Sequence, residues 1–170
     1  PVTFADMNGN GTTDVVWIQE EGATSLRYVD LMPNPYRGLL TRIDNGMGAV
    51  TTIRYRMSTE YMIEDKRAGK PWKTPLRTPI PVVAEMEISD SMDALGFEAM
   101  VSRTTYRYRD GFYDGEEREF RGFAKVTTIN HGDSYHETRT THTWLHVGKN
   151  LETGEDEEIL KGKPYMQVVE

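Results

Sequence analysis

The chain has 170 residues, with 20 Lys and Arg against 27 Asp and Glu, and its formal net charge is −7. Nucleic-acid binding rests on cationic surface, so this charge argues against a nucleic-acid partner. No apolar run approaches the roughly 20 residues that a membrane-spanning helix needs, and the absence of cysteine excludes disulfides and thiolate metal sites. The length suffices for one domain with a real core or for two small ones.

The first chemical signal is a loop rich in Asp, Asn and Gly near the start of the chain. Oxygen-bearing groups fall at every second loop position, and one of them is a main-chain carbonyl: Asp6, Asn8, Asn10, Thr12 (main chain) and Asp14. Calcium takes about six to eight hard oxygen ligands, and a glycine at the sixth position, here Gly11, permits the tight turn. We therefore predict a stabilising Ca²⁺ site here. The alternative is an Asx-rich turn that binds no metal.

The residues that follow this loop exclude an EF-hand. Trp17 stands where that loop needs a glutamate, and the run from Val15 to Ile18 is an apolar strand. The stretch from Phe4 to Trp17 resembles the FG-GAP (VCBS) repeat, whose family builds β-propeller blades around a calcium loop. The resemblance implies the same metal ligands. One such unit cannot bury its own face, so we expect further repeats upstream of it.

Alternation of apolar and polar residues is the main signal in the rest of the chain. Between turn signals rich in Asp, Asn and Gly, it predicts three hairpins: 39–43 with 49–58, 82–90 with 97–109, and 119–130 with 134–147. In the first hairpin, Ala49, Ile53, Tyr55 and Met57 share one face, and we expect them to be more buried than Arg54 and Arg56. The predicted fold is all-β, an antiparallel hairpin meander with little helix.

Two stretches depart from this alternation. Residues 59–81 are charged and carry four prolines, so we expect a long excursion or edge segment without a helix. Residues 148–163 are polar and acidic, and 155–161 could form one or two helical turns.

Several segments resemble the region that follows the propeller in the B component of insecticidal Tc toxin complexes and in SpvB-like and RHS-type proteins. They are 38–48, 71–83, 106–123 and 143–148. The resemblance implies a terminal blade fragment over 1–35 and, over 36–170, the start of an RHS-repeat β-shell. It implies a structural and assembly role in a secreted virulence complex, with no catalysis of its own. Its partners would be a pore-forming component and a cargo-bearing RHS component.

The block from Tyr106 to Phe123 interleaves aromatic rings with arginines and acids. As a scaffold, its rings pack between β-layers, and we expect Phe120 and Phe123 to be such anchors. As a recognition face, it would make the chain a calcium-dependent extracellular domain that binds carbohydrate or a cell surface. The acids cancel the basic character that a nucleic-acid platform needs, and we favour the scaffold.

The histidines are the strongest enzymatic candidates, and they are weak. His142 and His146 share parity on one expected strand, where four residues span about 13 Å, too far for both to bind one metal. The sequence contains no Gly-rich phosphate loop and no nucleophile motif. We predict that the chain is not an enzyme.

Overall fold

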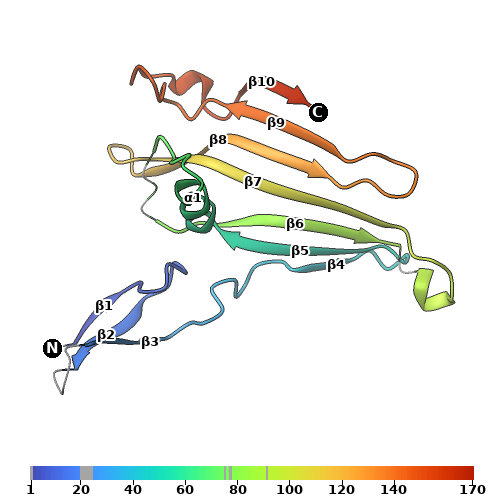
Figure 1. Ribbon diagram of the computed structural model, residues 1–170, viewed down its shortest axis with the longest axis horizontal. Coiled ribbons are helices and arrows are strands. Elements are labelled where there is room, and N and C mark those ends of the chain that lie inside the picture. The colour runs from blue at the N-terminus through green and yellow to red at the C-terminus, as the bar shows by residue number, and fades with distance from the viewer. Residues whose placement is uncertain (1, 20–24, 75, 77, 91) are drawn as a thin grey trace.

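The computed structural model describes residues 2–19, 25–74, 76, 78–90 and 92–170. It contains two open antiparallel sheets (Figure 1). The first has three strands, β1 (Val2–Ala5), β2 (Asp14–Gln19) and β3 (Ser25–Asp30). The second has seven strands that neighbour one another in chain order: β4 (Arg42–Asp44), β5 (Val50–Met57), β6 (Pro81–Ser89), β7 (Val101–Asp114), β8 (Glu119–Asn130), β9 (Arg139–Leu145) and β10 (Pro164–Val169). The prediction of an all-β hairpin meander is confirmed.

All three predicted hairpins are present. Strand β4 pairs with β5, β6 with β7, and β8 with β9, each antiparallel. The turns use the expected chemistry: the Asn45 side-chain oxygen accepts the N–H groups of Met47 and Ala49, at 2.8 and 3.0 Å. At the third turn the Asp133 carboxylate accepts the N–H groups of Tyr135 and His136. Strand β10, which pairs with β9, was not predicted.

Helix α1 (Ser58–Arg67) corrects the expectation that residues 59–81 hold no helix. Glu60 accepts the N–H of Met57 at 3.0 Å at the start of the helix, and Lys66 and Arg67 lie in its last turn. These features favour a helix, because they complement its free N–H groups and its dipole. Two short 3₁₀ helices, η1 (Met92–Leu95) and η2 (Glu158–Leu160), complete the elements. The second lies within residues 155–161, where one or two helical turns were expected.

Helix α1 fills a fork in the large sheet between β6 and β7 (Figure 1). The ladder between these strands stops at the pair Glu85 and Thr105, whereas β7 continues alongside β8 as far as Asp114. Tyrosine hydroxyls satisfy carbonyls that the opened ladder leaves unpaired: Tyr61 donates to the Tyr106 oxygen at 3.1 Å and Tyr108 to the Val83 oxygen at 3.0 Å. An unpaired buried carbonyl is costly, so these two bonds stabilise the fork.

The hydrophobic core lies in this fork. Its buried members are Tyr61, Leu76, Val82 and Phe123, with Trp72, Ile80, Tyr108, Phe120 and Val126 packed around them. The rings of Phe120 and Phe123 are therefore anchors, as predicted, but they do not pack between two β-layers. They pack between the sheet and the helix with its following segment, because the chain after α1 folds back over the end of β7 and β8.

The predicted two-faced burial of β5 holds only in part. Met57 is buried and Arg54 is exposed, but Arg56 is half-buried, like Ala49, Ile53 and Tyr55. The reason is helix α1, since the Arg56 guanidinium lies 4.5 Å from the centre of the Tyr61 ring and pairs with Glu60.

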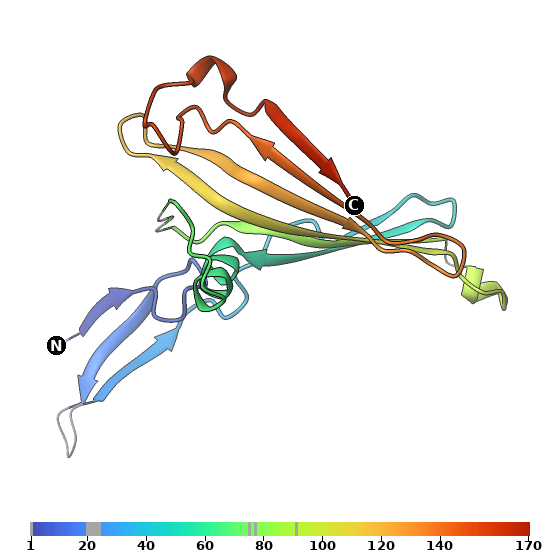
Figure 2. The same ribbon diagram turned by 45° about the horizontal axis from the view of Figure 1, so that its top comes forward.

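The three-stranded sheet projects from the end of the large sheet where α1 lies, as the turned view makes clear (Figure 2). Within the described residues, no helix is long and apolar enough to cross a membrane.

Candidate functional site

The loop of residues 6–14, here called the 6–14 loop, joins β1 to β2 and is organised around Asp6. One Asp6 oxygen accepts the N–H groups of Gly9 and Asn10, at 2.7 and 3.1 Å, and the other accepts that of Gly11 at 2.8 Å. These bonds wrap the backbone around the carboxylate, as short Asp side chains do in Asx turns. A carboxylate offers about four lone-pair positions, so Asp6 keeps capacity for one further partner.

The other loop side chains are tied to one another and to the end of β3. Asn10 accepts both the N–H and the hydroxyl of Thr12, at 2.8 and 2.6 Å. The side-chain nitrogens of Asn8 and Asn10 both donate to one oxygen of Asp30, at 2.7 and 3.2 Å. Asp30 was not predicted from the sequence, because nothing in its spacing links it to the loop. Only the register, which places it opposite Asp14, brings it there.

Asp14 is the most informative member of this group. Its residue is fully buried, and one carboxylate oxygen accepts the N–H of Met7 at 2.8 Å. The other oxygen is buried and has no hydrogen-bond partner within the described structure. A buried charge is costly unless it is paired or bound to a metal, so this oxygen fits a cation.

The structure thus brings Asp6, Asn8, Asn10, Thr12 and Asp14 into one loop. Among the described residues, no group of three or more His, Asp or Glu side chains is arranged to hold a metal ion. A metal bound here would therefore depend on amide and main-chain oxygens beside the two loop carboxylates, which hard cations such as Ca²⁺ accept.

The 6–14 loop also contacts the start of helix α1. The Thr59 hydroxyl donates to the Gly9 carbonyl at 3.3 Å. At Gly11, where φ is +82°, a Cβ atom would lie 3.4 Å from the Pro79 Cβ and 3.9 Å from the Met57 Cε. The loop is accordingly packed against the large sheet as well as belonging to the small one.

The aromatic block of residues 106–123 offers little recognition surface. Phe123 is buried, with ring centres 4.9 Å from Tyr108 and 5.3 Å from Phe120. Burial raises the pKa of Tyr108 to about 12, so its hydroxyl stays protonated and serves the Val83 carbonyl. Tyr113 is exposed, but a single ring is not a platform. Because these rings are buried, they cannot form the exposed aromatic face that carbohydrate binding by this block would require.

The histidines are dispersed and serve local contacts. His142 bonds to the Thr127 hydroxyl at 2.9 Å and His131 to that of Thr105 at 3.1 Å. His136 pairs with Asp133 in an exposed turn. His146 lies 2.7 Å from Glu157, and His142 also lies 3.8 Å from Glu170.

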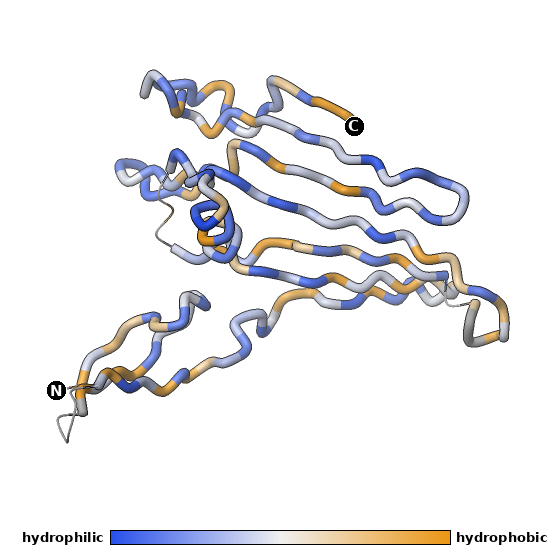
Figure 3. The backbone as a smooth tube through the Cα atoms, in the orientation of Figure 1, coloured by the Kyte–Doolittle hydropathy of each residue, from blue (hydrophilic) through white to orange (hydrophobic). Residues whose placement is uncertain are grey.

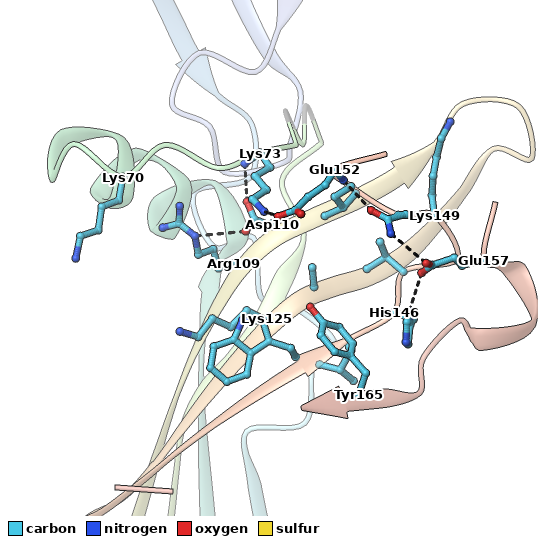
Figure 4. Close-up of a pocket in the computed structure, with 16 residues that line it drawn as sticks. Lys70, Lys73, Arg109, Asp110, Lys125, His146, Lys149, Glu152, Glu157 and Tyr165 are labelled. Atoms are coloured by element: carbon cyan, nitrogen blue, oxygen red, sulfur yellow. Dashed lines mark hydrogen bonds and ion pairs between the residues drawn. The ribbon is translucent and has the colours of Figure 1, made fainter. Parts of the chain in front are cut away.

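A cavity of about 610 Å³ opens beside β8, β9 and β10, and we call it the β8–β10 cavity (Figure 4). Its lining combines lysines with the rings of Trp144 and Tyr165. The Lys125 ammonium lies 4.5 Å from the centre of the Trp144 ring. This cavity was not predicted from the sequence, because its residues come from the segment after α1 and from four later segments that no motif links.

Comparison with known families gives a match over most of the chain. The model of the family described as the insecticide toxin TcdB middle/N-terminal region matches residues 1–151. A search of curated proteins finds no match.

Solved structures share the fold. A Tc holotoxin pore from Photorhabdus luminescens is 20% identical, with a TM-score of 0.77, over 99% of this chain and 10% of the other. A crystal structure titled TcdB2-TccC3-TEV is 26% identical, with a TM-score of 0.63, over 87% of this chain and 7% of the other. A TcdB2-TccC3 structure without the hypervariable C-terminal region is 27% identical, with a TM-score of 0.66, over the same shares. The chain spans about a tenth or less of each.

Proposed function

Because this chain belongs to the family of the insecticide toxin TcdB middle/N-terminal region, we propose that it is a structural and assembly module of a secreted toxin complex, without catalysis of its own. The observation that carries the proposal is the burial of the aromatic block: Phe123, Phe120 and Tyr108 form the core of the fork. Side chains that pack in the core stabilise the fold and are not accessible to a ligand or substrate.

Apolar surface on both sheets supports a place in a larger assembly. Val2 and Phe4 on β1 are each 68% exposed, and Val169 on β10 is 58% exposed. Figure 3 shows these apolar stretches along the small sheet and at the end of β10. Exposed apolar patches mark contacts with other protein surface, so neighbouring segments would cover them.

We further propose that residues 1–35 are a terminal FG-GAP blade fragment and that residues 36–170 begin an RHS-type shell. The partners would be the pore-forming and cargo-bearing components. The crystal structures titled TcdB2-TccC3 pair two named components, which supports a role in assembly.

The absence of catalysis is tested with the full-length protein that carries this segment. We expect the double substitution His146→Gln and Glu157→Gln to leave assembly with both components, and toxicity, unchanged. These residues form the closest histidine–acid pair in the described part of the chain. Size-exclusion chromatography with light scattering measures assembly, and a cell-killing assay measures toxicity. Toxicity lost by more than about tenfold while assembly stays intact would refute the absence of catalysis.

The finer proposal is that the 6–14 loop binds Ca²⁺ and is stabilised by it. Asp6, Asn8, Asn10, the Thr12 carbonyl and Asp14 would hold the ion, and the orphaned Asp14 oxygen supports this. Bound Ca²⁺ would supply positive charge that offsets the loop carboxylates.

Calorimetric titration with Ca²⁺ tests the metal proposal. We expect Asp6→Ala and Asp14→Asn to weaken binding by more than the roughly tenfold that loss of an outer-shell partner costs. Asp133→Asn is the matched control, since Asp133 also organises a turn but lies in the loop between β8 and β9. Absence of binding to the folded wild type, or equal affinity in all variants, would contradict the proposal.

A further inference from the structure

We propose that the β8–β10 cavity receives an acidic polypeptide segment that also carries apolar side chains. The proposal starts from the local charge. Five cationic side chains, Lys70, Lys73, Arg109, Lys125 and Lys149, line the cavity against three acids, Asp110, Glu152 and Glu157. This local excess of positive charge occurs in a chain whose net charge is −7.

The three acids are already matched. Glu152 pairs with Lys73 at 2.7 Å and Asp110 with Arg109 at 3.3 Å, and Glu157 is hydrogen-bonded to His146 at 2.7 Å. Lys70, Lys125 and Lys149 form no ion pair with any residue that the structure describes. The cavity therefore presents three lysines to an incoming ligand, and their charge selects an anionic one.

The placement of these lysines favours an extended ligand over a compact one. They come from three segments: the turn after α1, strand β8, and the loop after β9. Figure 4 shows Lys70 and Lys149 on opposite sides of the cavity, so they do not converge on one point. A phosphate or sulfate group needs donors that converge, whereas carboxylates spaced along a polypeptide can reach separate lysines.

The apolar part of the lining specifies the rest of the ligand. Leu145, Leu151 and the exposed ring of Tyr165 also line the cavity. The Trp144 ring has one face covered by the Lys125 ammonium, so that face is closed to a stacked sugar. Aliphatic or aromatic side chains of a peptide can bury this surface, which a highly polar oligosaccharide cannot.

The cavity walls are held in place before any ligand arrives. Arg121 joins β8 to the loop after β9, pairing with Glu158 at 2.5 Å and donating to the Gly148 carbonyl at 3.3 Å. An antiparallel main-chain β-bridge between Lys149 and Asp156 closes the same loop. A preformed site loses less entropy on binding, so a short peptide suffices as a probe.

The probe is a fluorescein-labelled peptide of alternating Glu and Leu with one central Phe, titrated with the protein and followed by fluorescence anisotropy. We expect saturable binding that weakens as salt is raised, because exposed charge pairs are screened. The same peptide with Gln in place of every Glu should bind at least about tenfold more weakly.

Two matched triple variants locate the binding. Lys70→Gln, Lys125→Gln and Lys149→Gln together should weaken binding roughly tenfold or more. Lys66→Gln, Arg67→Gln and Lys163→Gln remove the same charge from exposed positions outside the cavity and should leave binding unchanged. Melting curves of both variants show that they fold. Absence of peptide binding, equal loss in the two variants, or tighter binding of a sulfated oligosaccharide than of the acidic peptide would each overturn the proposal.

Discussion

At the scale of single residues, Phe123 unites the core. Its ring contacts Trp72, Tyr108 and Phe120, and a Cβ at Gly111 would lie only 2.9 Å from it. Strand β7 therefore needs glycine opposite this ring, because the ring packs too close to the Gly111 backbone to leave room for a side chain. A large side chain at Gly111 would have to displace the core.

We predict that Phe123→Ala lowers the free energy of unfolding by about 3–5 kcal/mol, the usual cost of removing a buried phenylalanine. Tyr113→Ala, on the same block but 47% exposed, should stay within about 0.5 kcal/mol of wild type. Urea denaturation measures both. Unchanged stability of Phe123→Ala, together with lost binding on a glycan array, would restore the recognition reading.

At this scale the sequence predicted the burial of Phe123, and it singled out the five loop residues, whose metal binding stays a prediction, but it gave no sign of Asp30. The large size of an aromatic ring and its place in an alternating pattern together predict that it is buried. Asp30 acquires its role only from the strand register that sets it opposite Asp14. Lys70, Lys125 and Lys149 are also ordinary surface lysines until the fold brings them to one cavity.

At the scale of elements, α1 shows where pattern reasoning stops. Its buried residues are Ser58, Tyr61 and Asp65, spaced like one helical face but mostly polar. Periodicity of apolar residues could not reveal it, whereas the hairpins combine alternation with turn residues and were predicted. The polar face is stable because each member is paired: Ser58 with the backbone of Ile80, and Asp65 with two arginines of β7 and with Trp72.

Asp65 gives the pH prediction. Burial acts to raise the pKa of its carboxyl, but bonds from Arg107 and Trp72 and the charges of Arg107 and Arg109 outweigh it and lower the pKa. A lowered folded pKa means stabilisation that is full above the unfolded value, about 3.9, and lost as pH falls through the folded value. Asp65→Asn should cost roughly 2–3 kcal/mol at neutral pH, and less as the pH falls below about 4.

Thermal melting from neutral pH to about pH 2 measures this effect. Glu98→Gln, a carboxyl of an exposed residue outside the network, is the control and should follow wild type. A gap between wild type and Asp65→Asn that stays constant across this range would show that the carboxylate charge does not hold α1 to β7.

At the scale of the whole molecule, the described contacts that join the two sheets come from the segment between β3 and β4 and from the 6–14 loop. The linker, which is residues 31–41 between β3 and β4, contributes the bond from the Tyr55 hydroxyl to the Leu40 carbonyl. The 6–14 loop contributes its contacts with Thr59, Pro79 and Met57. Local alternation predicts the three hairpins of the large sheet, but it carries no information about how one sheet sits on the other. That placement depends on side chains far apart in the sequence.

Substitutions at two glycines of the 6–14 loop distinguish the packing of the loop against its neighbours from strain within the loop. Gly9 and Gly11 both have positive φ, +74° and +82°, so valine at either position should cost about 1–2 kcal/mol in the loop itself. A side chain at Gly9 would meet nothing within 4 Å, whereas one at Gly11 would meet Pro79 and Met57. We therefore predict that Gly11→Val, and not Gly9→Val, speeds amide exchange at residues 57–60, measured by hydrogen–deuterium exchange with a calcium chelator present. The chelator removes Ca²⁺ from both variants, so the comparison between them reports the packing of the loop and not metal binding. Equal exchange at the start of α1 in the two variants would mean that the loop strains itself without bracing the helix, and that the linker alone holds the sheets together.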